Sequence, residues 1–327
     1  MDPDVICLRP ERDFLAIGVV PPAGLSITYT TPSDPSLASL LKAARALVIP
    51  AVGPALPGAL FRGTGLSLVQ VTGAGLDRLD RAVLAEEGIT LANVPGGSNG
   101  ALAEYCVATS LSLLRGFAAA TGPLRAGHYA AHRQAMVAAS LRGLGDLTVG
   151  LVGMGTIGLA VASAFRAMGA TIVYHDPAPP RDAAALDRIG ARRMDLDALL
   201  AEADVVTLHV PLMDATRNLI NAARLARMKP GAILINAARG GIVDEAALAA
   251  ALETGHLGGA AVDVYTTEPP TPHNPLLTVS DAAAARLILT PHIAGVSLQS
   301  SQRLFRDAWD NVERVLIDGR PASNIVA

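Results

Sequence analysis

Short apolar runs separated by amphipathic stretches recur along nearly the whole chain, a pattern typical of strands that alternate with helices. In the N-terminal part, these runs predict strands at residues 5–8, 46–52, 68–72 and 89–93, with helices at 37–45 and 77–87. Because alternating strands and helices form parallel sheets, we expect this part of the chain to build a sheet of its own.

The same alternation resumes further along and predicts a second sheet. Its strands are expected at residues 149–152, 171–174, 205–208, 232–236, 259–263 and 287–289, with helices at 157–168, 196–201, 222–227 and 245–253. The strands of both sheets are almost wholly apolar, as in parallel sheets that helices cover on both faces. The predicted fold class is therefore α/β, with two doubly wound parallel-sheet domains.

Several segments stand outside this alternation. Glycine and proline at residues 93–100 indicate a hinge, and the strongly apolar residues 101–117 predict one long buried helix. Residues 127–142 are less regular and are expected to form an excursion. Residues 297–316 predict a helix long enough to return to the first domain, followed by an extended piece at 324–326. The first domain is thus expected to be discontinuous.

Three glycines mark the start of the second sheet. Gly153, Gly155 and Gly158 follow a predicted strand and open a predicted helix, in the pattern G-x-G-x-x-G. Such glycines permit a tight turn, close approach of the backbone to a pyrophosphate, and contact between helix and strand. Asp176 follows the next strand, where a carboxylate can accept hydrogen bonds from an adenosine ribose. Glycines alone would indicate only a turn, but this order of strand, glycines, helix, strand and acid predicts dinucleotide binding.

Charge and composition exclude several classes of function. The 327 residues carry 26 Lys and Arg against 29 Asp and Glu, without a basic stripe, so we expect no nucleic-acid partner. No apolar tract approaches the length of a membrane span, and the charged start lacks a secretion signal, which favours a cytoplasmic protein. Cys7 and Cys106 lie in apolar segments and are expected to be core residues, so no metal site is predicted.

Polar residues follow the strands of the second sheet. His209, Arg239, Asp263 and His292 each end or follow one of its predicted strands. In open parallel sheets, ligands bind beyond the carboxyl ends of the strands. Buried strands do not need polar residues there for stability. The clustering therefore predicts a catalytic crevice at the edge that carries the glycine turn.

Two of these residues, together with Glu268, suit the reduction of a carbonyl group by a nicotinamide. The reaction needs a proton donor near the carbonyl oxygen and a cation for the substrate. His292 is the candidate acid/base, because imidazole titrates near neutrality, and Arg239 offers a planar fork to a carboxylate. Glu268 could hold the far nitrogen of His292 and stabilise its protonated form. Alone, each residue would indicate a packing role or a surface charge. Their shared position at one edge of the second sheet favours a catalytic role.

Two loops of the first domain are candidates for substrate contacts. Residues 71–77, which include Ala74 and Gly75, join a strand to a helix, and their amides could hold a carboxylate. An ordinary strand-to-helix turn fits the spacing equally well. Residues 50–54 end a neighbouring strand and could form an adjacent wall.

With these residues in view, the sequence resembles the D-isomer-specific 2-hydroxyacid dehydrogenases over nearly its whole length. Beyond the glycine turn, the matching stretches are residues 73–77 (GAGLD), 93–96 (NVPG), 103–104 (AE), 209–212 (HVPL), 235–244 (INAARGGIVD), 261–265 (AVDVY) with 268–269 (EP), and 290–295 (TPHIAG). Motifs of this length in this order are highly specific.

The resemblance implies a Rossmann NAD-binding domain, residues 98–297, inserted into a flavodoxin-like substrate domain of residues 1–97 and 298–327. It implies Arg239, Glu268 and His292 as catalytic residues, and Ala74, Gly75 and Arg239 as ligands of the substrate. NAD is the implied cofactor, and the positions implied for it are Gly153, Gly155, Thr156, Ile157, Gly158, Asp176, His209, Val210, Pro211, Ala237, Ala238, Asp263 and Gly295.

The resemblance also implies a homodimer that pairs through the NAD-binding domain. Relatives often carry Trp where this chain has Tyr129 and His132. We therefore expect substrate choice to depend on these two residues together with the loop at 50–54. Asp176 would repel the 2′-phosphate of NADP, and residues 177–180 place no cation beside it, with Arg181 the nearest, so NAD is expected over NADP.

Two other functions suit the same fold. A dehydrogenase of another small anion, phosphite, has a closely similar active site, whereas the formate type places Gln where this chain has Glu268. A corepressor-like protein that senses NAD can keep the Arg, Glu and His without turnover. The predicted function is nevertheless the NAD-dependent interconversion of a 2-keto acid and its D-2-hydroxy acid.

Overall fold

The chain folds into two compact units, and each is described by itself. Unit 1 comprises Met1–Ser98 and Val296–Ala327, and unit 2 comprises Asn99–Gly295. The computed structural model describes residues 2–139 and 141–326; Met1, Ser140 and Ala327 lie outside the described residues. The predicted excursion at 127–142 is therefore described except for residue 140.

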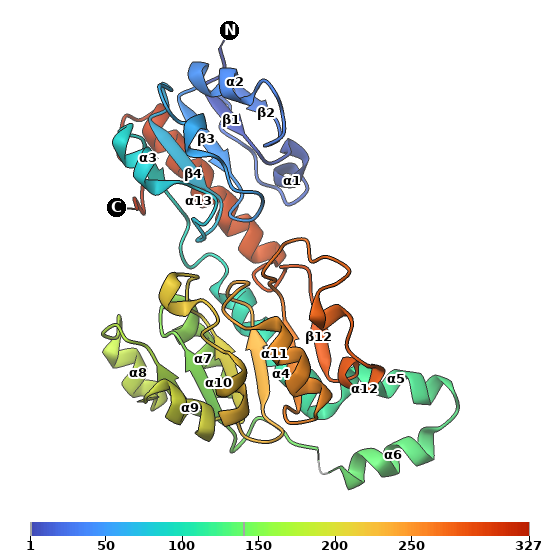
Figure 1. Cartoon of the computed structure of the whole chain (residues 1–327). Helices are drawn as coiled ribbons and strands as arrows, with labels where there is room; N and C mark the ends of the chain where they lie inside the picture. The colour runs from blue at the N-terminus through green and yellow to red at the C-terminus, as the bar shows by residue number, and fades with distance from the viewer. Residues whose placement is uncertain (1, 140, 327) are drawn as a thin grey trace. The chain divides into compact units, whose positions relative to one another are not determined.

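Unit 1 is built on a five-stranded parallel sheet with the strand order β2-β1-β3-β4-β5 (Figure 1), the flavodoxin-like order. Its strands are β1 Val5–Cys7, β2 Ile27–Tyr29, β3 Ala46–Ile49, β4 Leu68–Val71 and β5 Thr90–Ala92. Its helices are α1 Glu11–Leu15, α2 Leu37–Ala43, α3 Arg81–Glu86 and α13 Leu298–Leu316, with a short 3₁₀ helix, η1 Gly58–Leu60.

Successive side chains of these strands enter opposite cores. Ile6 packs with α2 and α3 on one face, whereas its neighbour Cys7 packs with Phe14 of α1 and with Phe305 and Trp309 of α13 on the other. The C-terminal helix thus covers one face of the first sheet together with α1, although nearly the whole chain lies between β1 and α13 in sequence. An antiparallel bridge from Ala92 to Ile325 joins the final extended piece to β5.

Unit 2 is built on a seven-stranded parallel sheet with the order β12-β11-β10-β9-β6-β7-β8. Its strands are β6 Thr148–Val152, β7 Thr171–His175, β8 Arg192–Arg193, β9 Val205–Leu208, β10 Ile233–Asn236, β11 Gly259–Val262 and β12 Leu287–Leu289. From β8 to β11 this is the Rossmann order, and β12 extends it by one strand. The order reverses between β6 and β9, which places the switch point beside the glycine turn.

Helices cover both faces of the second sheet. The cores place α4, α7 and α8 on one face and α9, α10 and α11 on the other. The helices are α4 Asn99–Arg115, α5 Phe117–Arg125, α6 Tyr129–Ala138, α7 Thr156–Ala167, α8 Ala183–Ile189, α9 Leu196–Glu202, α10 Ala222–Arg227, α11 Glu245–Glu253 and α12 Asp281–Ala284, with 3₁₀ turns η2 Asp214–Thr216 and η3 Pro275–Leu277. Figure 1 shows α5 and α6 extending away from the remainder of unit 2 as an arm.

The predicted fold class is confirmed, while several boundaries differ. The strand predicted at 46–52 ends at Ile49, because Pro50 has no N–H for the sheet. The long helix ends at Arg115, where Gly116 adopts a φ of +62°. The excursion is more regular than expected, because most of it forms α6. The sequence pattern missed α6 because the helix buries no residue and therefore has no apolar stripe.

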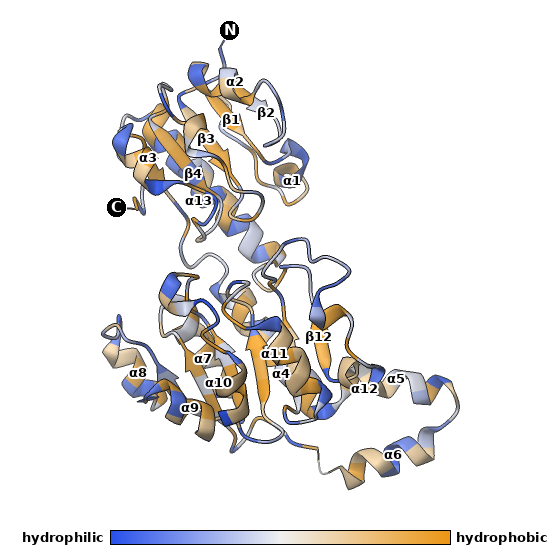
Figure 2. Cartoon of the chain, viewed as in Figure 1, coloured by the Kyte–Doolittle hydropathy of each residue, from blue (hydrophilic) through white to orange (hydrophobic). Residues whose placement is uncertain are grey.

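Apolar side chains are concentrated in the strands, whereas the helices mix both kinds (Figure 2). Cys7 and Cys106 are free and buried, as expected for core residues. Among the described residues, no helix combines the length and the apolar character needed to cross a membrane.

Candidate active site

The three glycines of the turn after β6 have different surroundings. A Cβ atom at Gly153, where φ is +97°, would lie 2.5 Å from the carbonyl oxygen of His209, and one at Gly158 would lie 2.3 Å from the carbonyl oxygen of Gly153. Packing within the protein therefore requires both glycines. A Cβ at Gly155 would meet nothing within 4 Å. The open space beside Gly155, at the start of α7, fits a pyrophosphate that the backbone must approach closely.

The acid after β7 is anchored to this turn. Asp176 accepts hydrogen bonds from the amides of Met154, at 2.7 Å, and Ala178, at 2.9 Å. The guanidinium of Arg193, from β8, donates to the main-chain carbonyls of Asp176 and Pro177. The expectation that Arg181 is the nearest cation is therefore incomplete, because the parallel pairing of β7 with β8 brings in Arg193 from further along the chain.

His209 follows β9 and is a desolvated histidine. Its Nε2 lies 3.0 Å from the hydroxyl of Thr207, and burial lowers its pKa to about 4. The imidazole is therefore neutral at physiological pH and does not suit a general acid. Its main-chain carbonyl instead forms the wall against which Gly153 packs.

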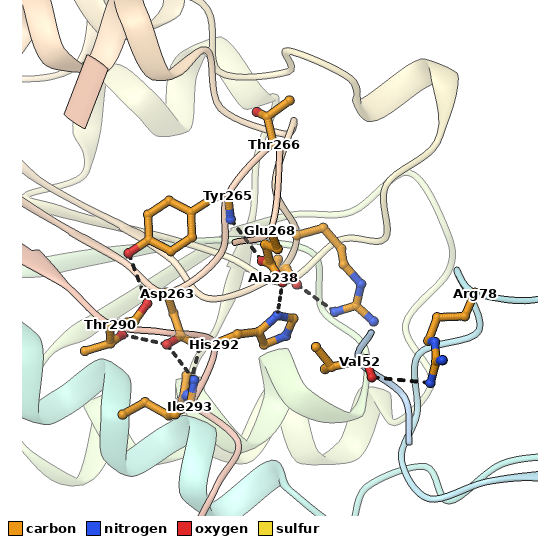
Figure 3. A network of polar contacts seen from close by, with 12 residues as sticks. Val52, Arg78, Ala238, Asp263, Tyr265, Thr266, Glu268, Thr290, His292 and Ile293 are labelled. Atoms are coloured by element: carbon orange, nitrogen blue, oxygen red, sulfur yellow. Dashed lines mark hydrogen bonds and ion pairs between the residues drawn. The ribbon is translucent and has the colours of Figure 1, made fainter. Parts of the chain in front are cut away.

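Asp263, directly after β11, organises the segment that carries His292. The carboxylate is almost fully buried and accepts hydrogen bonds from the hydroxyl of Thr290 and from the amides of Ile293 and Ala294, both at 2.8 Å (Figure 3). The main-chain carbonyl of Asp263 accepts a further bond from the His292 amide at 2.8 Å. These contacts hold His292 at a φ of +56°, which is uncommon for a non-glycine residue.

The imidazole of His292 is paired with a carboxylate. Its Nδ1 lies 2.8 Å from Oε2 of Glu268, and the other carboxylate oxygen accepts the amide of Tyr265 at 3.0 Å. The two side chains are 26% and 29% exposed, so the pair is open to ligands but partly shielded from water. Because Nδ1 is occupied, Nε2 is the nitrogen available to a substrate. The contact expected between Glu268 and His292 is present.

The segment after β10 presents Arg239. Asn236 accepts the amide of Ala238 at 3.2 Å and donates to the carbonyl of Arg239 at 3.1 Å, which closes a tight turn. Nη1 of Arg239 donates to the carbonyl of Ala238 at 2.7 Å. A Cβ at Gly240 would lie 1.8 Å from the carbonyl oxygen of Tyr265. Only glycine therefore allows the Arg239 turn to pack against the segment that carries Glu268.

Glu245, the first residue of α11, braces the same segment and was not singled out from the sequence. Its carboxylate accepts the amide of Thr266 at 2.6 Å, the hydroxyl of Thr266 at 3.0 Å and the amide nitrogen of Asn274 at 2.8 Å. These bonds hold both sides of the loop that presents Glu268. The sequence offered one signal, an acidic residue directly after the helix cap Asp244.

The candidate substrate loop of unit 1 follows β4. Ala74 is exposed and Gly75 half-buried. The carbonyl of Ala74 accepts the side-chain amide of Asn93 at 2.9 Å, and the carbonyl of Gly73 accepts the amide of Val94 at 2.9 Å. The loop is thus fixed by its carbonyl groups, and its carbonyl side is turned toward the segment after β5.

A glycine turn at the switch point, an acid after β7 and a His–Glu pair at the carboxyl edge of a Rossmann sheet are typical of a dinucleotide-dependent oxidoreductase. Residues 107–294 match the model of a protein family described as "D-isomer specific 2-hydroxyacid dehydrogenase, NAD binding domain". The chain belongs to this family, its cofactor is NAD, and it is an oxidoreductase.

Relatives with assigned activities act on different substrates. The (S)-sulfolactate dehydrogenase of Chromohalobacter salexigens is 42% identical over 257 residues, which cover 79% of this chain and 80% of the relative. The D-3-phosphoglycerate dehydrogenase of Archaeoglobus fulgidus is 38% identical over 229 residues, or 70% of this chain and 41% of the relative. The chain thus spans less than half of that relative's length.

Solved structures share both units. The apo D-mandelate dehydrogenase of Rhodotorula graminis superposes with a TM-score of 0.81 at 26% identity, covering 100% of this chain and 98% of that one. The likeness extends over the five-stranded and the seven-stranded sheet alike. The family and the fold are therefore common to these proteins, while their named substrates differ.

Proposed function

We propose that the protein interconverts a small 2-keto acid and its D-2-hydroxy acid, with His292 as the acid/base. The observation that carries this proposal is the 2.8 Å contact between His292 Nδ1 and Glu268. A carboxylate on one nitrogen fixes the orientation of the ring and leaves the other nitrogen available to a substrate oxygen. His292 then donates a proton to the developing alkoxide during reduction and accepts one during oxidation.

Other residues bind and orient the reactants. In unit 2, the guanidinium of Arg239 suits the carboxylate or keto oxygen of the substrate, because its planar fork matches paired oxygens. In unit 1, we assign the loop at Ala74 and Gly75 to the substrate carboxylate. When bound, NADH supplies the hydride. The glycine turn and Asp176 would hold its pyrophosphate and ribose, with Thr156, Ile157, His209, Val210, Pro211, Ala237, Ala238, Asp263 and Gly295 as the remaining proposed contacts.

The domain roles and the assembly follow from the same proposal. Unit 2 corresponds to the NAD-binding domain and unit 1 to the substrate domain. The arm of α5 and α6 carries exposed apolar side chains, including Phe117, Leu124, Tyr129 and Val137. A cavity of about 540 Å³ on this arm is lined by Tyr129, His132, Arg133 and apolar neighbours. We propose that a second copy covers this surface in a cytoplasmic homodimer.

A panel of substrates tests the reaction. Pyruvate, hydroxypyruvate, glyoxylate, phenylpyruvate, 3-sulfopyruvate, 3-phosphohydroxypyruvate and, in the oxidising direction, phosphite would be assayed with NADH or NAD and with the NADP forms. We expect turnover of at least one 2-keto acid to its D-2-hydroxy acid, with NADH preferred. Turnover of phosphite alone would replace the proposed substrate class. NADH binding without any turnover would favour a binding protein.

A single substitution tests the proton donor. His292→Gln should lower kcat by about 10²-fold or more, the scale of a lost general acid, while the Kd for NADH stays within about twofold, well under 1 kcal/mol. His273→Gln is the matched control, because His273 is an exposed histidine of the same unit. Near-normal turnover by His292→Gln would remove His292 from this role.

A further inference from the structure

Arg78 is a buried cation at the end of the candidate substrate loop. The residue is only 4% exposed. Its Nε donates to the carbonyl of Pro54 at 2.8 Å, and its Nη1 donates to the carbonyls of Pro50, at 2.7 Å, and Val52, at 3.3 Å. All three acceptors belong to one loop, residues 50–54, which follows β3. Figure 3 shows the guanidinium of Arg78 turned toward Val52.

The shape of this loop depends on the guanidinium. Gly53 adopts a φ of +136°, and a Cβ there would lie 3.1 Å from Cζ of Arg78, so the loop backbone packs directly on the guanidinium. The main-chain carbonyl of Arg78 accepts the amide of Leu56 at 2.8 Å and thereby fixes the chain just beyond the loop. Because β3 and β4 are paired neighbours, Arg78 joins the loops that follow both strands.

The charge of Arg78 has no counter-ion. Across residues 2–139 and 141–326, no carboxylate forms an ion pair with its guanidinium, and Nη2 is buried without a hydrogen-bond partner. Guanidinium groups stay protonated in proteins, and a buried charge without a partner is costly. Carbonyl dipoles offset part of this cost. The remaining positive charge lies at the end of the loop that contains Ala74 and Gly75, and a positive charge there would favour the binding of an anion.

We propose that Arg78 is a specificity-determining positioning residue: it shapes the 50–54 loop as a wall of the substrate site and supplies uncompensated positive charge for the substrate carboxylate. The inference rests on the proposed 2-keto acid reduction. Arg78 thus has two proposed roles. Its charge favours binding of the carboxylate that all 2-keto acids share, whereas the shape of the 50–54 loop affects which side chains of the keto acids fit.

Two substitutions separate these tasks. Arg78→Lys keeps the charge but loses the planar fork that reaches three carbonyls. Arg78→Met keeps an unbranched stem and removes both charge and donors. Both variants would be assayed with NADH against a short keto acid, pyruvate, and a bulky one, phenylpyruvate. The Kd for NADH and the melting temperature would be measured alongside.

We expect Arg78→Met to raise KM for both keto acids by about tenfold or more, because the loop loses its shape and its positive charge, with kcat changed far less. Arg78→Lys should keep most of the affinity for keto acids but change the ratio of kcat/KM between pyruvate and phenylpyruvate by roughly tenfold. The Kd for NADH should not change. Arg62→Met is the control, because it removes an exposed arginine, paired with Glu86, from the same unit.

A further variant keeps the inference testable if Arg78→Met fails to fold. Gly53→Ala retains the arginine but pushes the loop away from it, and should change the substrate ratio as Arg78→Lys does. Folded Arg78 variants with unchanged KM and unchanged ranking would overturn the inference, as would a loss confined to kcat. Absence of keto-acid turnover by the wild type would instead overturn the proposed function, so the two failures are distinguishable.

Discussion

Two acids hold His292 and act on different parts of it. Asp263 is almost fully buried and fixes the main chain of residues 292–294, whereas Glu268 is partly exposed and contacts the imidazole ring. Loss of Asp263 would therefore displace the whole segment. Glu268→Gln should leave the main chain in place and remove only the charge beside the ring, which makes Glu268 the sharper position for a test.

Glu268→Gln should slow keto-acid reduction. The imidazole loses its charged partner at 2.8 Å, so the ring is less firmly held for proton transfer to the substrate. kcat should fall by roughly tenfold or more, while the Kd for NADH should not change. Steady-state assays and NADH titration would measure both quantities. Turnover as high as that of Glu253→Gln, a control at another acid of unit 2, would contradict the assigned role.

His209 should make the fold sensitive to acid. Burial lowers its pKa from 6.5 to about 4. Between these values the unfolded chain binds a proton that the folded chain does not, so the free energy of unfolding falls as the pH falls through this window. The contribution lost is at most about 3 kcal/mol. Urea titrations of wild type and His209→Asn at pH 7 and 4.5 would measure it, with exposed His273→Asn as control. The prediction would be contradicted if the free energy of unfolding fell equally between pH 7 and pH 4.5 in all three proteins.

At the scale of elements, close contacts between loops position the site. The Arg239 turn packs on the carbonyl of Tyr265 through Gly240, and Glu245 at the start of α11 braces the segment that carries Glu268. The catalytic groups thus belong to loops, while strand ends and a helix start hold those loops in place. Substitutions at Gly240 or Glu245 are expected to act by displacing the loops that carry Arg239 and Glu268.

The glycine turn provides a matched pair of substitutions. Gly158→Ala places a Cβ 2.3 Å from a backbone oxygen, so it should destabilise the β6–α7 connection by several kcal/mol. Gly155→Ala meets nothing within 4 Å and should leave the melting temperature nearly unchanged. Because its methyl group would enter the space assigned to the pyrophosphate, it should weaken NADH binding by about tenfold or more. Calorimetry would measure the melting temperatures, and titration with NADH would measure binding. Tight NADH binding by Gly155→Ala would contradict the assignment of the pyrophosphate to this space.

At the scale of the whole molecule, the arm of α5 and α6 is the part without a core of its own. Helix α6 buries no residue, and Val137 is 66% exposed. An exposed apolar surface of this kind is typical of an interaction site. The proposed homodimer accounts for a helical arm that packing within one chain does not stabilise.

Charged substitutions on the arm should dissociate the proposed dimer. Leu124→Glu combined with Val137→Glu should yield a monomer in sedimentation experiments, because burying two carboxylates in an apolar interface is costly. Met168→Glu is the control, since Met168 is an exposed apolar residue elsewhere in unit 2. A dimer that persists in the double variant would place the interface on another surface.

Much of the fold could be predicted because its signals are local. Apolar runs of strand length, the glycine turn and the four-residue repeat of the last helix each lie within one short segment. The weakest predictions fall where local signals are weak. The half-buried β2 was missed, because its three residues lack a clear apolar pattern, and so was the surface helix α6 as a regular element.

The sequence by itself determined the fold class, the family, the cofactor and the set of polar residues at the strand ends, because periodicity and motif spacing are properties of adjacent residues. Only the tertiary structure decided which distant groups meet. Parallel pairing of β7 with β8 brings Arg193 to Asp176, α11 brings Glu245 to the Glu268 segment, and the pairing of β3 with β4 brings Arg78 under the 50–54 loop. These contacts depend on strand order and loop packing, which no local pattern of residues encodes.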